Sequence, residues 1–268
     1  MSAAIQNVFK MLWGDYTDLN PRLLALEKKI EERGDVIIND HVAFRTFDDS
    51  RINVESMGRI FTQLGYAAMD FYEFDAKKLK ARYFEPPEAG QPKVFISELM
   101  VSKLSNWAQK KIAGLLDAVH VGSALSPEFL VSGRPWEPVS YADYNQLKEE
   151  SEYAAWMSVF GFRVNHFTIS INALKTFEGL PDFNMFMKSC GYILNTQGGE
   201  IKGSPGLGLE QSSTMASQIP CEFSDGTYSI PACYYEFALR HPVDGGLFPG
   251  FLPESADKIF ESTDHKRK

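Results

Sequence analysis

Cysteine is scarce in this chain of 268 residues, and long apolar runs are missing. The three cysteines, Cys190, Cys221 and Cys233, form an odd set without close spacing, which fits neither a disulfide framework nor a zinc cluster. No stretch reaches the roughly 18 apolar residues of a membrane-spanning helix. The first 20 residues lack the apolar core of a signal peptide. We therefore expect a protein of the reducing cytoplasm.

Positive charge is also in short supply. The chain has 27 Lys and Arg against 35 Asp and Glu, a net charge of −8. An acidic protein repels nucleic acids and anionic membranes unless it carries a basic patch. The only basic run is the C-terminal stretch 265–268, which we interpret as a solvated tail. We expect no nucleic-acid partner and no membrane partner.

Apolar residues, at 44%, are sufficient for a core, and the 20 Phe make it an aromatic one. Apolar spacing predicts helices at 3–13, 22–32, 53–64, 102–118, 141–158 and 181–190. It predicts strands at 36–47, 67–74, 81–85, 93–98, 162–172 and 192–204, and a hairpin at 221–240 that turns at Asp225-Gly226. The pairs Asp40-His41 and Asn165-His166 each open a strand that a helix and further strands follow. This echo suggests two βαβββ-like units.

Three strands each carry one possible metal ligand on a small or polar face. Alternate residues of a strand share a face. These faces hold His41 with Ala43 and Arg45, His166 with Thr168 and Ser170, and Glu236 with Ala238 and Arg240. If the sheet curls so that they converge, two imidazoles and one carboxylate form the facial triad of non-haem Fe(II) oxygenases. The same ligands suit Mn or Zn, so ligand type alone leaves the metal open.

Plainer interpretations of these residues remain. A lone histidine in a strand is usually a structural residue. A carboxylate such as Glu236, set among apolar neighbours, must be paired or bind a metal, and Arg240 on its own face is a possible partner. Because ligands at 41, 166 and 236 need both chain halves, we expect one metalloenzyme domain over 1–264, with a helical insert at about 100–160, before the tail 265–268.

Several segments resemble one enzyme family. They are NDHVAFRTF (39–47), GFRVNHFTISIN (161–172), LEQSSTMA (209–216), CYYEFALR (233–240) and the stretch 246–263. They are similar to the 2-oxoadipate dioxygenase/decarboxylase family, also described as hydroxyglutarate synthases. The resemblance implies an α+β fold related to the vicinal-oxygen-chelate metalloenzymes, a curved mixed sheet or partial barrel of βαβββ units with flanking helices.

The resemblance also implies a chemistry. His41, His166 and Glu236 would hold Fe(II), which Zn, Ni or Mn can replace in purified protein, and Arg45 would grip a substrate carboxylate. Family activity converts 2-oxoadipate to 2-hydroxyglutarate with O₂ and loss of CO₂. The expected partners are thus a small 2-oxo dicarboxylic acid and O₂; no oligomeric state is predicted.

Arg45 has a geometric argument of its own. It lies four residues beyond His41, roughly 13 Å along the strand at about 3.3 Å per residue. A guanidinium folded back from there suits the far carboxylate of a five- or six-carbon diacid. The alternative is that Arg45 pairs with a structural acid. Further candidates for contact with substrate are Thr168, Ser170, Gln211 and Arg240, for which ordinary hydrogen bonding is the plainer interpretation.

Two other functions remain open on the sequence alone. One is a glyoxalase-type hydrolase or lyase that uses a metal to polarise a carbonyl or to activate water. The other is a non-catalytic protein that binds a metal or an oxo acid. Oxygen consumption with Fe(II), compared with Zn, distinguishes the first, and ligand-dependent stabilisation without turnover identifies the second.

Overall fold

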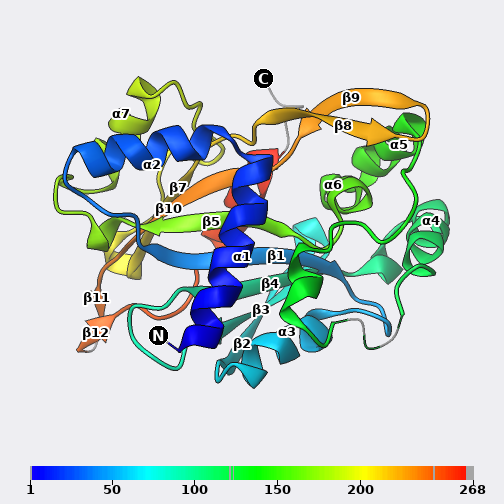
Figure 1. Ribbon diagram of the computed structural model, residues 1–268, viewed down its shortest axis with the longest axis horizontal. Helices are drawn as coiled ribbons and strands as arrows, with labels where there is room; N and C mark the ends of the chain where they lie inside the picture. The colour runs from blue at the N-terminus through cyan, green and yellow to red at the C-terminus, as the bar shows by residue number, and fades with distance from the viewer. Residues whose placement is uncertain (1, 121, 123, 244, 264–268) are drawn as a thin grey trace.

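A single mixed sheet of eight strands organises the protein (Figure 1). The computed structural model describes residues 2–120, 122, 124–243 and 245–263. The strands of this sheet are β1 (Asn39–Phe47), β2 (Ala67–Phe74), β3 (Leu79–Glu85), β4 (Lys93–Leu99), β5 (Val164–Ser170), β6 (Lys202–Ser204), β7 (Leu209–Ser213) and β10 (Tyr234–Arg240). Their order across the sheet is β2-β3-β4-β1-β5-β10-β7-β6.

The sheet consists of two halves with the same internal order. In the first half, β1 runs parallel to β4, and β3 and β2 follow outward. In the second half, β5 runs parallel to β10, and β7 and β6 follow outward. The halves join where β1 and β5 pair antiparallel. This confirms the α+β class and the two βαβββ-like units that the sequence suggested.

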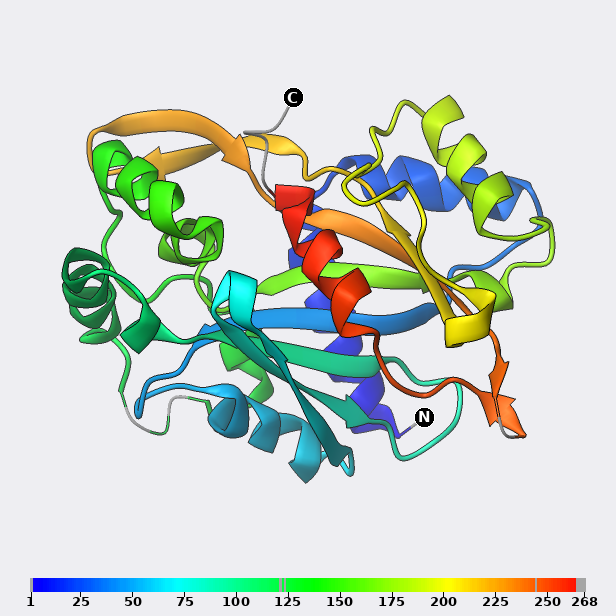
Figure 2. The ribbon, with the colours of Figure 1, turned by 180° about the vertical axis from the view of Figure 1, so that it is seen from behind.

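Helices cover both faces of the sheet. The α-helices are α1 (Ala3–Leu19), α2 (Arg22–Glu32), α3 (Val54–Gln63), α4 (Asn106–Leu116), α5 (Tyr141–Glu150), α6 (Glu152–Phe160), α7 (Leu180–Ser189) and α8 (Pro253–Ile259). The 3₁₀ turns are Asp75–Lys77, Val101–Lys103, Pro127–Val131, Ile171–Ala173, Pro205–Leu207 and Phe260–Thr263 (η6). Helix α1 crosses one face of the sheet (Figure 1), and α8 lies over the opposite face (Figure 2). None of the helices in the described ranges is both long and apolar enough to cross a bilayer.

Helix α3 shows how local sequence sets an element. Asn53 caps its start, since the Asn53 side chain accepts from Ser56 N–H while the Ser56 hydroxyl accepts from Asn53 N–H. The apolar residues Val54, Met57, Ile60 and Phe61 share the buried side of the helix. Gly58 lets the Phe84 ring come close, because a Cβ at this position would lie 2.3 Å from Phe84 Cζ. The helix therefore packs tightly on β3.

Three sequence expectations need correction. The single helix expected at 141–158 is two helices, because Ser151 adopts an extended conformation and caps α6 through Ala154 N–H. The expected hairpin at 221–240 is instead β8 (Gln218–Phe223) and β9 (Gly226–Pro231), which leaves β10 free to join the main sheet. Its turn is Ser224-Asp225, one residue earlier than expected, because Gly226 already pairs with Phe223 as the first residue of β9.

The strand expected at 192–204 shrinks to β6, because Gly198 and Gly199 both adopt positive φ and break the extended chain. A small pair, β11 (Pro242–Val243) and β12 (Gly246–Leu247), follows β10. The stretch predicted as a helical insert contains α4, α5 and α6. The predicted tail 265–268 lies outside the described residues, as does residue 264.

Candidate metal centre

His41, His166 and Glu236 meet on one face of the sheet. One ligand atom from each lies within 4.8 Å of the others, and all three residues are buried. The strand pairing explains this, because Thr168 of β5 is paired with His41 on one side and with Glu236 on the other. His166 lies two residues from Thr168 on the same strand and therefore on the same face. The convergence expected from strand periodicity is present.

Two β-bulges orient the histidines. The first bulge is at Asp40 of β1, which has no partner between the pairs Asn39–Ile169 and His41–Thr168. The second is at Asn165 of β5, which has no partner between the pairs Ala43–His166 and Phe44–Val164. A bulge turns a side chain away from strict alternation. Asp40 Oδ1 lies 2.7 Å from His41 Nδ1, and Asn165 Oδ1 lies 3.1 Å from His166 Nδ1.

These contacts fix the tautomer of each ring. An acceptor at Nδ1 keeps the proton there and leaves the lone pair on Nε2. His166 Nε2 lies 3.1 Å from Glu236 Oε2, and His41 Nε2 lies 3.6 Å from Glu236 Oε1. Both Nε2 atoms therefore lie beside the Glu236 carboxylate, and His41 Nε2 also contacts the Thr168 hydroxyl. From the sequence, Asp40-His41 and Asn165-His166 were noted as similar pairs at the starts of two strands. No role for Asp40 or Asn165 was predicted.

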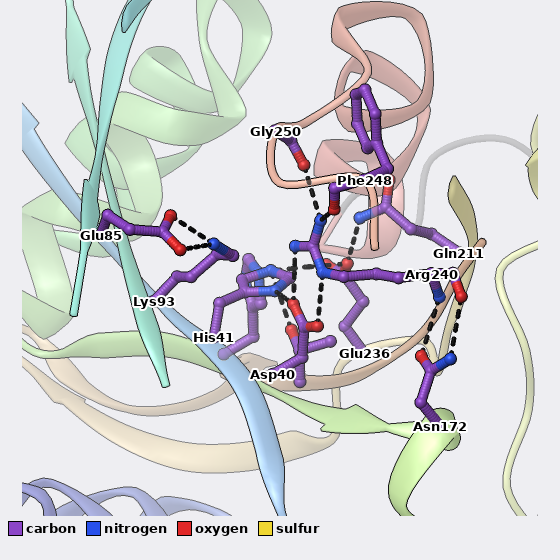
Figure 3. A network of polar contacts seen from close by, with 12 residues as sticks. Asp40, His41, Glu85, Lys93, Asn172, Gln211, Glu236, Arg240, Phe248 and Gly250 are labelled. Atoms are coloured by element: carbon purple, nitrogen blue, oxygen red, sulfur yellow. Dashed lines mark hydrogen bonds and ion pairs between the residues drawn. The ribbon is translucent and has the colours of Figure 1, made fainter. Parts of the chain in front are cut away.

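Asp40 is held from its other side by Arg240 (Figure 3). Burial would raise the pKa of Asp40, but the ion pair with Arg240 and the contact with His41 bring it well below its usual range. The remaining guanidinium nitrogen, Nη1, donates to the carbonyls of Phe248 and Gly250. Asp40 is thus a buried anion that is fixed in place.

The pKa shifts of His166 and Glu236 favour the protonation states that bind metals. Burial lowers the pKa of His166, which keeps the imidazole neutral against the pull of Glu236. Burial alone would raise the pKa of Glu236, but the two histidines and an N–H bond from Gln211 outweigh it and lower the pKa. Neutral imidazole and carboxylate are the ligating forms.

The spacing of each histidine nitrogen from the Glu236 carboxylate suits a shared cation. Two adjacent ligands with bonds of about 2.1 Å lie about 3.0 Å apart when they meet at a right angle at the metal. The two histidine-to-carboxylate separations, 3.1 and 3.6 Å, are close to this value. Two imidazoles and one carboxylate form the donor set of a catalytic metal site with open positions. The arrangement suits Fe(II), Mn or Zn.

A small cavity of about 20 Å³ adjoins the triad. This is about the space that one water molecule needs. Besides the triad, the cavity is lined by Phe95, Gln211, Tyr234, Phe251, Ala256, Ile259 and Phe260. The last four belong to α8, η6 and the segment just before them, which cover this face of the sheet (Figure 2). The sequence motifs did not reveal Tyr234, Phe251 or the α8 cover as parts of the site.

Arg45 lies beside the site in a closed environment. Its side chain is fully buried, with Nη1 3.2 Å from Glu152 Oε1 and Nη2 3.1 Å from Thr263 Oγ1. It lies over the rings of Tyr153 and Trp156. Pairing with an acid was the alternative left open for this residue, and Glu152 is that acid. Nε has no hydrogen-bond partner among the described residues. A role in substrate binding stays a prediction.

The other substrate candidates divide between two places. Thr168 Oγ1 lies 3.0 Å from His41 Nε2, and the Gln211 side chain donates to Glu236, so both touch the triad. Ser170 and Arg240 instead line a groove of about 450 Å³ on the Asp40 side, with Lys93 nearby. Every guanidinium nitrogen of Arg240 already has a partner. Substrate contact by these four residues stays a prediction.

Comparison with known proteins gives a consistent result. The family model for 2-oxoadipate dioxygenase/decarboxylase matches residues 14–125 and 127–246. A protein of Arabidopsis thaliana named "2-oxoadipate dioxygenase/decarboxylase, chloroplastic" is 36% identical over 97% of this chain and 78% of its own length. These matches agree with the family that the sequence motifs resemble.

Solved structures share the fold. The hydroxyglutarate synthase of Oryza sativa in complex with 2-oxoadipate has a TM-score of 0.90 and 34% identity, covering 100% of this chain and 95% of that one. A protein of Shewanella frigidimarina with a provisional hydrolase name has a TM-score of 0.88 and 45% identity, covering 94% and 99%.

A glyoxalase-superfamily protein of Ralstonia eutropha, with a TM-score of 0.74 and 21% identity over 92% of this chain and 85% of its own, shares the fold alone. This likeness confirms the expected relation to the vicinal-oxygen-chelate fold. From the family model and the plant relative, it follows that the chain belongs to the 2-oxoadipate dioxygenase/decarboxylase family.

Proposed function

We propose that this protein is an Fe(II)-dependent dioxygenase and decarboxylase that converts a 2-oxo diacid, 2-oxoadipate or a close analogue, to a 2-hydroxy acid such as 2-hydroxyglutarate. The observation that carries the proposal is the buried triad, with both histidine Nε2 atoms within 3.6 Å of the Glu236 carboxylate. His41, His166 and Glu236 are the proposed ligands. Family membership supports the activity, and the rice relative was solved with 2-oxoadipate bound.

The protein's own residues bind, orient and exclude water. Bound iron supplies the activation of O₂ and of the 2-oxo acid. Asp40 and Asn165 keep the imidazoles oriented, and Gln211 donates to the Glu236 carboxylate. Phe95, Phe251 and Phe260 form an apolar wall that keeps bulk water from the reacting groups. We assign Arg45 to the far carboxylate of the diacid, which its buried charge and partnerless Nε support.

Substrate entry requires a movement. A cavity of about 20 Å³ is far smaller than a six-carbon diacid. On the other side of α8 lies a groove of about 660 Å³, lined by Lys202, Lys258 and the start of α8. We infer that α8 and η6 shift outward so that the anionic substrate reaches the triad from this groove.

One experiment tests the activity. The protein is stripped of metal, loaded with Fe(II) without oxygen, and mixed with O₂ and C4 to C6 2-oxo acids while O₂ uptake, CO₂ and the hydroxy acid are measured. Equal amounts of O₂ consumed, CO₂ released and 2-hydroxy acid formed support the proposal. Glu236→Gln should abolish turnover. The control is Glu210→Gln on the neighbouring strand β7, which should keep turnover because Glu210 pairs with His241 and not with the triad.

A metal-dependent hydrolase is the second candidate, because a relative 45% identical to this chain bears a provisional hydrolase name. Turnover with Zn in the absence of oxygen would favour the hydrolase. Turnover that occurs only when both Fe(II) and O₂ are present would exclude the hydrolase. A protein that binds the acid without turnover would match the third, non-catalytic possibility.

We also propose that residues 1–264 form one domain and that the protein works in the cytoplasm. The ligands come from both halves of the sheet, and the three cysteines are unpaired, as a reducing compartment favours. Limited proteolysis that released a half with full metal affinity would contradict the single domain. Fractionation of the source cells tests the location.

A further inference from the structure

The hydroxyl of Tyr234 is a buried polar group without a partner. Tyr234 lies on β10, two residues before Glu236, and its side chain is 1% exposed. Its ring stacks on the His166 imidazole, with centroids 4.5 Å apart and planes at 24°. Among the described residues, no atom forms a hydrogen bond with its hydroxyl. Burying an O–H group without a partner is costly, so such a group needs an explanation.

A second donor without a partner lies nearby. Arg45 Nε is also buried and unpaired in the described part of the chain, although both Nη atoms are bound. Tyr234 and Arg45 are close enough to interact electrostatically. Tyr234 lines the triad cavity itself. Tyr234 is a donor that lines the cavity and lacks an acceptor, and the unpaired Arg45 Nε is within electrostatic range of it, which points to an acceptor that belongs to a ligand.

Tyr235 shows that a partnerless hydroxyl alone is not sufficient. Its hydroxyl is equally buried and also has no partner within the described ranges. Adjacent residues of a strand point to opposite faces, and Tyr235 packs near Trp13 and Tyr16 of α1, away from the triad. It is not among the residues that line the triad cavity. The position of Tyr234, not its burial, is what marks it.

We propose that Tyr234 is a substrate-binding residue whose hydroxyl donates a hydrogen bond to the carboxylate of the 2-oxo diacid farther from the metal, beside Arg45 Nε. This inference rests on the proposed function and adds a residue to it. A carboxylate accepts several hydrogen bonds, so it satisfies both donors at once. The ring stack on His166 sets the direction of the hydroxyl. Tyr234 thus links recognition of the second carboxylate to the metal-binding face.

The test compares Tyr234→Phe with Tyr235→Phe, since each change removes one oxygen and keeps the ring. Both variants and the wild type are loaded with Zn(II), which binds without oxidising the ligand. Calorimetry then measures the affinity for 2-oxoadipate and for 2-oxohexanoate, a monocarboxylic 2-oxo acid of the same length. Zn affinity and melting temperature are measured alongside.

We expect Tyr234→Phe to weaken binding of the diacid at least tenfold and binding of the mono-acid less than about twofold. Zn affinity should be unchanged, and the melting temperature should be equal or higher, because the variant no longer buries an unsatisfied hydroxyl. Tyr235→Phe should leave both affinities unchanged. Equal losses on both acids, or no loss on either, would overturn the role of Tyr234. A wild type that binds neither acid would overturn the proposed function as well.

Discussion

Arg240 and Asp40, 200 residues apart in the chain, form a two-pronged ion pair: Arg240 Nε lies 2.7 Å from Asp40 Oδ2, and Nη2 lies 2.9 Å from Oδ1. Asp40 Oδ1 also accepts from His41 Nδ1 (Figure 3). Arg240 therefore supports the orientation of His41 through Asp40. All three of its guanidinium nitrogens already have partners.

Arg240→Lys should weaken metal binding by about 10- to 100-fold, the usual effect of losing support behind a ligand. Lysine keeps the charge but cannot hold both oxygens of Asp40 in one plane. Competition with a chromogenic chelator for Zn measures the change. The matched control is Arg82→Lys, an arginine of β3 that pairs with Glu55 away from the site. Equal affinities for wild type and Arg240→Lys would refute the link.

The metal-free protein should lose stability as pH falls below about 6.5. The folded-state pKa of His166 lies below its ordinary value of 6.5, so the unfolded chain takes up the proton first as pH falls. The folded-state pKa values of Glu236 and Asp40 are also lowered, from 4.5 and 3.8, so their contribution is present above these values and lost below them. The three shifts have the same sign.

Urea unfolding of the metal-free protein at several pH values measures this loss. In Asp40→Asn the step near pH 4 should be smaller than in the wild type, while the step near pH 6 remains. A free energy of unfolding that is flat from pH 7 to pH 4 would contradict the assignment.

Arg45→Lys should lower turnover of a dicarboxylic 2-oxo acid at least about tenfold, a loss of roughly 1.4 kcal/mol in transition-state stabilisation. A monocarboxylic acid of similar length has no second carboxylate and should suffer much less. Metal content should stay the same, since Arg45 is not a ligand. Steady-state kinetics on iron-saturated protein make the comparison. Equal losses would assign Arg45 to the fold, through Glu152 and Thr263.

Binding of the diacid should change hydrogen exchange in the segment 251–263, because this segment closes a cavity that is too small for the ligand. Mass spectrometry of Zn-loaded protein with and without 2-oxoadipate measures the effect. Helix α4 lies away from the cavity and serves as the internal reference. If the acid binds and the exchange of 251–263 is unaltered, the substrate enters by another route.

Two glycines should respond in opposite ways to alanine. Gly161 has φ +63°, and a Cβ there would lie 2.2 Å from Gly133 O, so Gly161→Ala should cost at least about 2 kcal/mol. Gly14 lies inside α1 with nothing within 4 Å of its Cβ position, so Gly14→Ala should add about 0.5–1 kcal/mol. Chemical denaturation compares the two, and a stable Gly161→Ala would mean that the 133–134 backbone yields easily.

The sequence was sufficient to predict that His41, His166 and Glu236 converge, because the alternation of side chains along a strand is local and regular. His41, His166 and Glu236 each lie on the polar face of a short strand, and that face is readable from neighbouring residues. Their meeting depends on β5 pairing with both β1 and β10, a pairing that strand alternation alone did not specify. The division at Ser151 was missed, because helical residues on both sides of it mask a break made by one extended residue.

The supporting contacts could not be found by the same logic. Strict alternation places Asp40 and His41 on opposite faces, and only the bulge at Asp40 brings them together. The partner of Arg240 is 200 residues away, so no local pattern reveals it. The α8 cover depends on how a C-terminal segment returns across the sheet. Long-range packing, not local preference, decides these features.

The repeated order of the two half-sheets allows a comparison of His41 with His166 as corresponding positions. His41 is paired with Lys93 of β4, and His166 is paired with Tyr234 of β10 in the same way. Two residues farther along these partner strands lie Phe95 and Glu236, which therefore occupy corresponding positions. A carboxylate at both positions would make a four-ligand site with pseudo-twofold symmetry. Phe95 instead puts a ring at the cavity wall, so the first half contributes one candidate ligand and the second half contributes two. Two similar half-sheets therefore make an asymmetric site, with an aromatic wall where the second half has a carboxylate.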